Sequence, residues 1–133
     1  MVSMRGSGFR LGAARVSTKQ AGDAAEDVAL RHLQHAGLRL VERNYRTPGR
    51  GGGEIDLIMR ERDGTMVFVE VRARRAVSHG GAAASVGAVK RQRIVFAARH
   101  YLLRLGVLPA CRFDVVLLDG GQIEWLRAAF DAV

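Results

Sequence analysis

Two carboxylates in the middle of the chain are the residues best suited to chemistry. Asp56 lies in the β-rich run 54–61 and Glu70 in the β-rich run 65–73. The turn sequence 62–64, Arg-Asp-Gly, separates the two runs and is typical of a β-hairpin. The way in which the hairpin pairs therefore decides whether the two carboxylates meet.

The length of the hairpin loop sets this register. A glycine at Gly64 suits a three-residue loop with a G1 bulge, in which Asp56 faces Glu70 on the adjacent strand. The same register gives one apolar face, made of the pairs Met59 with Val67, Leu57 with Val69 and Ile55 with Val71. A two-residue loop would set Asp56 opposite Val71 and mix charges with valines on both faces, so we prefer the three-residue loop.

Directly opposed carboxylates repel each other unless a cation or a proton lies between them. Two hard oxygen ligands at this spacing suit Mg²⁺ or Mn²⁺, which makes Asp56 and Glu70 a predicted metal site. The alternative is a structural pair that shares a proton or has an arginine neighbour. We expect Glu54 to form a cross-strand ion pair with Arg72 and so to be less available to a metal.

Two helical residues are candidates to complete this site. Glu26 lies along one edge of the first predicted helix, where it can reach over the sheet as a third carboxylate. Lys90 lies one turn before Ile94 on the apolar stripe of the second predicted helix. An ammonium at that position either serves a buried acidic site or extends its charged end to solvent, and the sequence leaves both open.

The elements that position these residues follow from capping and periodicity. Ser17 and Gln20 have the spacing of a capping box, and Gly37 ends the first helix. The predicted elements, in order, are helix 18–36, strand 38–45, strands 54–61 and 65–73, a helix from Ser85, strand 113–118 and a short strand 123–126 with a frayed helical tail. This α-β-β-β-α-β-β order predicts an α/β fold with one mixed sheet and flanking helices.

Charge narrows the class of partner. The 133 residues include 21 Lys and Arg against 13 Asp and Glu, a formal charge of +8, which favours nucleic acid as the partner. A ribosome-associated or merely soluble basic protein is the alternative. Residues 1–16 contain no acid and no periodicity, so we expect a disordered basic arm, followed by a single domain over 17–133.

Localisation is predicted from what the chain lacks. Cys111 is the only cysteine, so an intramolecular disulfide is excluded and a reducing cytoplasm is expected. The N-terminal residues have no apolar stretch of signal-peptide length, and no later stretch approaches a membrane span. We therefore expect a cytoplasmic protein with no membrane partner.

Several motifs together resemble the YraN-like family of uncharacterised bacterial proteins. They are 53–58 (GEIDLI), 67–72 (VFVEVR), the spaced Gly and acidic pattern of the first helix, 42–46 (ERNYR) and the spaced pattern from Lys90 to Leu102. The resemblance covers about residues 17–127. That family is similar to the PD-(D/E)xK nuclease superfamily, which has a restriction-endonuclease-like fold and relatives among archaeal Holliday-junction resolvases.

The resemblance implies roles for individual residues. Glu26, Asp56 and Glu70 would bind Mg²⁺ or Mn²⁺, and Arg72 occupies the position of the superfamily's lysine. Arginine cannot act as a base at neutral pH, although it can stabilise negative charge at a phosphate. Lys90 would then supply the missing amine from the second helix.

The function that follows is a metal-dependent, structure-selective endonuclease that hydrolyses phosphodiesters. Asp56, Glu70, Arg72 and Lys90 would form the catalytic set. The nucleic-acid backbone, with DNA favoured over RNA, would be held by further arginines: Arg43, Arg46, Arg50, Arg74 and Arg75. A homodimer is compatible with the resemblance, and the alternative function is a non-catalytic nucleic-acid or ribosome-binding domain that retains the nuclease fold.

Overall fold

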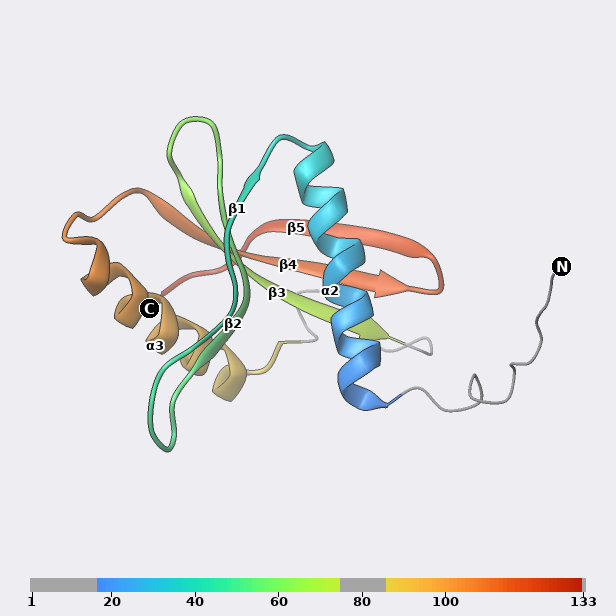
Figure 1. The fold of residues 1–133 in the computed structure, drawn as a ribbon, viewed down its shortest axis with the longest axis horizontal. Coiled ribbons are helices and arrows are strands. Elements are labelled where there is room, and N and C mark those ends of the chain that lie inside the picture. The colour runs from blue at the N-terminus through green and yellow to red at the C-terminus, as the bar shows by residue number, and fades with distance from the viewer. Residues whose placement is uncertain (1–16, 75–85, 133) are drawn as a thin grey trace, which may run out of the picture.

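A five-stranded sheet lies between two helices in the computed structural model, which describes residues 17–74 and 86–132 (Figure 1). The elements are α2 (Thr18–His35), β1 (Arg39–Arg46), β2 (Glu54–Arg60), β3 (Met66–Arg74), α3 (Ala88–Leu105), β4 (Cys111–Asp119) and β5 (Gln122–Phe130). The predicted order, helix, three strands, helix and two strands, is confirmed. The predicted arm 1–16 lies outside the described residues.

Both helices begin and end close to where the sequence predicted. The capping box is present at α2, where Ser17 Oγ accepts from Gln20 N at 3.0 Å and Ser17 N donates to Gln20 Oε1 at 2.9 Å. The second helix begins at Ala88 rather than at Ser85, which lies outside the described residues, and Gly87 caps it without a side chain. Neither helix is both long and apolar enough to cross a membrane.

The sheet has the order β1-β2-β3-β4-β5, and only β3 and β4 pair in parallel. The connection between these parallel strands contains α3. Each helix covers one face, as Figure 1 shows: Leu57 and Val69 belong to the α2-side core, and Ile58 and Phe68 to the α3-side core. Burial on both faces explains why the central strands are apolar almost without alternation.

The hairpin register is the predicted one as far as the pairing extends. Leu57 pairs with Val69, and Gly64 has a φ of +94°, as the G1 bulge requires. The predicted continuation is wrong at Ile55, which lies in the α3-side core instead of sharing a face with Leu57. The ladder ends at Leu57, and the Asp56 side chain replaces a ladder acceptor by binding the Val71 N–H at 2.8 Å.

The last strand corrects another prediction. We expected a short strand with a helical tail, whereas β5 extends to Phe130. A register shift between Phe113 and Val115 and a positive φ of 49° at Ala128 mark an irregularity in the ladder. Asp114 explains why the strand continues, because its buried carboxylate accepts from the Ala128 N–H at 2.9 Å.

Candidate functional site

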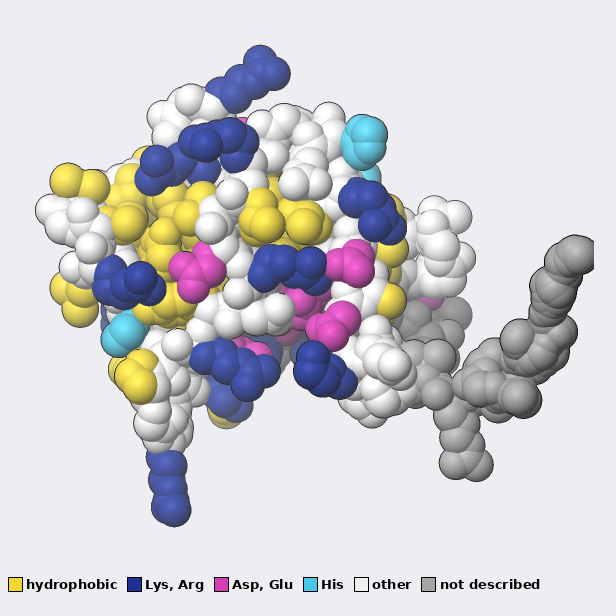
Figure 2. Space-filling model, viewed as in Figure 1, with side chains coloured by type: hydrophobic (Ala, Val, Ile, Leu, Met, Phe, Trp, Pro, Cys, Tyr) yellow, Lys and Arg dark blue, Asp and Glu magenta, His cyan; other side chains and the backbone are white. Residues whose placement is uncertain are grey.

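The three predicted carboxylates line one cleft, of about 790 Å³, at the N-terminal half of α2. Figure 2 shows acidic side chains gathered on this face of the molecule with Lys and Arg side chains around them. The cleft also reaches the end of β3 and the start of α3. The residues lining it that could do chemistry are Lys19, Asp23, Glu26, Asn44, Arg46, Glu54, Asp56, Glu70, Arg72 and Lys90.

Glu70 is the buried centre of this cleft, with only 3% of its surface exposed. Its Oε2 lies 3.5 Å from Arg72 Nη1 and 3.9 Å from Lys90 Nζ. Its Oε1 is buried and has no hydrogen-bond partner among the described residues. One oxygen therefore faces two cations, and the other is buried without a hydrogen-bond partner among the described residues.

The electrostatics of Glu70 disfavour its charged form. Burial, followed by the charge of Asp56, raises the pKa of Glu70 to about 8, and the positive charges of Lys90 and Arg72 offset only part of this effect. The direct side-chain interaction with Asp56 raises the pKa further. Glu70 therefore holds a proton to a higher pH than an exposed glutamate does.

Asp56 is held in place by the backbone of the neighbouring strand. Its Oδ2 accepts from the Val71 N–H at 2.8 Å, at the point where the β2–β3 ladder stops. This hydrogen bond fixes the carboxylate beside Glu70, with which it interacts directly. The pair predicted from the hairpin is therefore brought together through a side-chain contact rather than by continued strand pairing.

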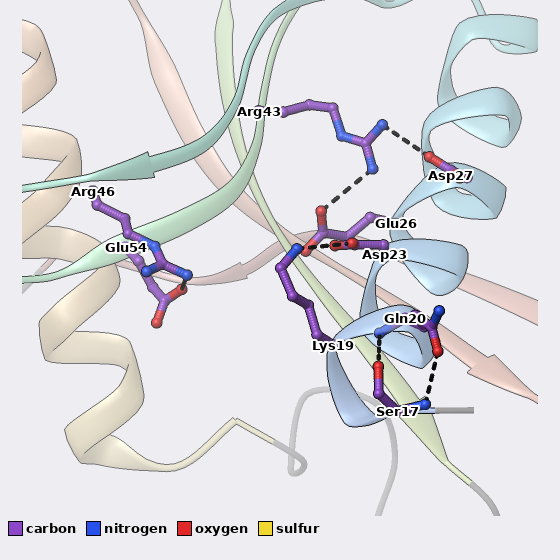
Figure 3. Close-up of polar contacts among 9 residues, drawn as sticks. All are labelled: Ser17, Lys19, Gln20, Asp23, Glu26, Asp27, Arg43, Arg46 and Glu54. Atoms are coloured by element: carbon purple, nitrogen blue, oxygen red, sulfur yellow. Dashed lines mark hydrogen bonds and ion pairs between the residues drawn. The ribbon is translucent and has the colours of Figure 1, made fainter. Parts of the chain in front are cut away.

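Glu26 reaches the same cleft from α2 but already has partners. Glu26 Oε1 lies 3.4 Å from Arg43 Nη2. When the amide nitrogen of Asn44 is turned towards Glu26, Asn44 donates to both carboxylate oxygens, at 3.2 and 3.3 Å. Figure 3 shows Arg43 between Glu26 and Asp27. Arg43 Nη1 lies 2.8 Å from Asp27 Oδ1. Burial and the charge of Asp56 raise the pKa of Glu26, while Arg43 lowers it.

These groups differ in how well they suit a divalent metal. Asp56 and Glu70 together suit a hard cation, because their donors are carboxylate oxygens and one Glu70 oxygen has no hydrogen-bond partner among the described residues. Within residues 17–74 and 86–132, no three Asp, Glu, His or Cys side chains form a ready ligand cluster. Glu26 therefore does not complete a preformed set of three in this conformation.

The predicted backbone-gripping arginines have different environments. Arg43 is only 30% exposed and is engaged by Glu26 and Asp27, so its charge is largely used inside the protein. Arg46 is 73% exposed and lies 3.9 Å from Glu54, as Figure 3 shows. Glu54 thus pairs with Arg46 and not, as we expected, with Arg72, whose partner is Glu70.

Of the other three predicted arginines, Arg50 is exposed in the loop between β1 and β2, and one residue that was not predicted joins the site. Arg74 ends β3, and Arg75 lies outside the described residues. Asn44 was not predicted, although it contacts Glu26 and lines the cleft. Its φ of +52° gives a reason for the residue type, because asparagine tolerates the left-handed region better than most side chains.

Comparison with known proteins identifies relatives along most of the chain. Residues 25–118 match the sequence profile of the Uncharacterised protein family UPF0102. A UPF0102 protein of Albidiferax ferrireducens is 72% identical over 116 residues, covering 87% of this chain and 91% of the relative. One from Paracidovorax citrulli is 70% identical over 122 residues, covering 91% and 90%. The chain belongs to the UPF0102 family, the YraN-like family that the sequence motifs resemble.

Proposed function

We propose that this UPF0102 chain binds Mg²⁺ or Mn²⁺ in its acidic cleft and acts as a structure-selective endonuclease on nucleic acid, with DNA favoured over RNA. The observation that carries the proposal is the close pair of Asp56 and buried Glu70, next to two cationic side chains, with one Glu70 oxygen that has no hydrogen-bond partner among the described residues. A carboxylate pair with facing cations matches what phosphodiester hydrolysis needs: a metal position and charges that bind the phosphate.

Asp56 and Glu70 would hold the metal, with Glu26 as a further ligand once it leaves Arg43 and Asn44. When bound, a divalent metal supplies positive charge against the phosphate and makes a water easier to deprotonate. The chain supports this role by keeping Glu70 buried and by fixing Asp56 on the Val71 N–H.

Arg72 and Lys90 would act directly on the phosphate. Arg72 is 41% exposed at the cleft and presents fixed N–H donors, which suit the non-bridging phosphate oxygens. Lys90 is 29% exposed, and its amine lies 3.9 Å from Glu70 Oε2. Because a lysine can lose its proton and an arginine cannot, Lys90 is the better candidate to move a proton during the reaction.

The charge of the whole chain supports nucleic acid as the substrate. A net charge of +8 attracts polyanions over long range, and exposed Arg46 and Lys19 lie at the edge of the cleft. The names of the relatives give the family and no substrate. Backbone contacts of this kind position a nucleic acid without reading its bases, so we expect recognition of structure and not of sequence.

A second candidate is a nucleic-acid or ribosome-binding domain that retains the fold but does not cleave. Two observations favour it. Arg72 lies at the position where the PD-(D/E)xK nuclease superfamily has a lysine. Glu26 is held by Arg43 and Asn44 and is not free to bind a metal together with Asp56 and Glu70. Such a protein would bind with a steep dependence on salt and would not need Asp56.

The discriminating experiment measures cleavage of labelled four-way junctions and linear duplexes in Mn²⁺, with wild type, Asp56→Asn and Glu124→Gln. Glu124 is an exposed carboxylate on β5 and serves as the matched control. The enzyme proposal predicts cleavage by wild type and Glu124→Gln and none by Asp56→Asn. Binding by all three without cleavage would establish the second candidate, and equal cleavage by Asp56→Asn would identify a contaminating nuclease.

A further inference from the structure

The loop between β1 and β2 adjoins the acidic cleft. It spans residues 47–53 with the sequence Thr-Pro-Gly-Arg-Gly-Gly-Gly. A hollow at its base is lined by Arg46, Glu54 and Arg93, and the first two of these also line the cleft. In Figure 1 this hairpin end projects beyond the sheet near the first turns of α3. The loop is therefore placed to meet whatever extends out of the cleft.

The base of the loop is closed by a buried threonine. Thr47 is 8% exposed, its N–H donates to Gly53 O at 3.1 Å, and its Oγ1 accepts from Gly53 N at 2.8 Å. These two bonds join the first and last residues of the loop. A loop with so much glycine would otherwise sample many conformations, so this closure limits its movement at the root.

A second set of contacts fixes the same base to α3. Arg93 Nε donates to Gly52 O at 3.2 Å. A Cβ at Gly53 would lie 1.9 Å from Arg93 O and 3.1 Å from Ala97 Cβ, so only glycine allows the loop to lie this close to the helix. The root is thus held against α3 by both a hydrogen bond and close packing.

Beyond this root, Arg50 is exposed at the middle of the loop and forms no ion pair with any described residue. It lies three positions after Thr47, a span of at most about 10 Å at the length of an extended chain. Phosphates of one DNA strand advance about 3.4 Å along the helix axis per nucleotide. Arg50 therefore stays within about three phosphate spacings of Thr47, from where it can contact a phosphate that lies outside the cleft.

We propose that the loop 47–53 is a clamped finger whose Arg50 binds a backbone phosphate a fixed distance from the cleft, with Thr47 as its positioning residue. The inference rests on the proposed function, because it takes the cleft to hold nucleic acid. Two fixed points of contact select the path of a phosphate backbone and not its bases. The finger thereby gives a physical basis for preferring one nucleic-acid structure over another.

The test measures binding of a fluorescent four-way DNA junction by anisotropy over about 50–200 mM salt. Losing one phosphate contact should reduce the slope of log affinity against log salt by about one and weaken binding roughly eightfold at about 0.1 M salt. We expect this for Arg50→Ala. Arg62→Ala removes an exposed arginine from the turn at the other end of β2 and should bind as wild type does. Equal binding by Arg50→Ala and Arg62→Ala would overturn the proposal.

Variants of the root test the clamp separately from the charge. Thr47→Val keeps the shape but loses the Oγ1 acceptor, so binding should weaken, while Thr47→Ser should bind like wild type. The double variant Thr47→Val with Arg50→Ala should bind no more weakly than Arg50→Ala alone, because both changes remove one contact. Additive losses would overturn the positioning role.

An insertion covers the case in which Thr47→Val fails to fold. Two extra glycines after Gly49 keep Arg50 and its charge but free it from the root, so affinity should fall towards that of Arg50→Ala. Unchanged affinity would overturn the clamped geometry. Failure of the proposed function looks different: wild-type protein would bind neither junction nor duplex, whatever the loop contains.

Discussion

Replacing Glu70 by glutamine should stabilise the metal-free protein at alkaline pH, although it removes a residue of the candidate site. Burial and the Asp56 charge raise the Glu70 pKa to about 8, so the folded state holds a proton that the unfolded state releases near its ordinary value of 4.5. Stability is then greatest below about pH 4.5 as far as this group is concerned, and falls as pH rises towards 8.

The size of this effect follows from the two pKa values. The difference between about 8 and 4.5 corresponds to about 5 kcal/mol in the free energy of unfolding. The wild-type protein loses this amount of stability as pH rises from 4.5 to 8, and the loss does not grow at higher pH. Glutamine has the same shape and no charge, so Glu70→Gln should lack this loss. At pH 9 the variant should be more stable than wild type by up to about 5 kcal/mol.

The assay is urea unfolding of the metal-free protein at pH 5, 7 and 9. Glu124→Gln, at an exposed position of β5, is the control and should follow wild type at every pH. Adding Mn²⁺ at pH 9 should stabilise wild type and leave Glu70→Gln unchanged, because a ligand stabilises only the state that binds it. A Glu70→Gln variant that loses stability with pH as wild type does would refute this account of the cleft.

Three further predictions test the fold and the site. Asp114→Ala should cost about 3–5 kcal/mol in urea unfolding, because the fully buried carboxylate pairs with Arg112 and accepts from Trp125 Nε1 and the Ala128 N–H, which would lose this acceptor. Gly53→Ala should cost about 1–3 kcal/mol through its overlap with α3, whereas Gly22→Ala, in open space on α2, should be neutral or stabilising in the same thermal unfolding assay. Lys90→Met should abolish Mn²⁺-dependent cleavage in the junction assay while leaving Mn²⁺ binding by calorimetry intact; loss of both would place Lys90 in the metal site.

Local sequence patterns predicted the elements well where a single interaction dominates. Ser17 and Gln20 form the expected capping box, and Gly64 takes the positive φ that fixed the hairpin register as far as Leu57. Each of these depends on residues a few positions apart. Such short-range chemistry can be read from a single chain, because no distant contact competes with it.

Predictions failed where a distant residue decides the structure. The extent of β5 depends on Asp114, which binds the Ala128 N–H from the neighbouring strand and holds an irregular ladder together. The position of Ile55 depends on the end of the β2–β3 ladder, where the Asp56 side chain takes over a backbone donor. The helical tail predicted after residue 126 is therefore wrong, because tertiary contacts hold this segment in the sheet.

The candidate site shows the same division. The hairpin register predicted that Asp56 lies next to Glu70, and the two side chains do interact. Strand pairing has ended at this point, however, and Asp56 is held there by its hydrogen bond with the Val71 N–H. The partners of Glu26, Arg43 and Asn44, could not be predicted, because they lie on β1 and meet α2 only in the folded chain. Ion pairs between elements depend on how far each long side chain reaches, which periodicity does not encode.

The central claim is that Asp56 and Glu70 bind a divalent metal, and a calorimetric titration of Mn²⁺ into the purified protein at pH 8.5 tests it most directly. The account predicts saturable binding at one site per chain by wild type and by Glu124→Gln, and none by Asp56→Asn. Absence of binding by wild type, or binding by Asp56→Asn with unchanged affinity, would contradict it.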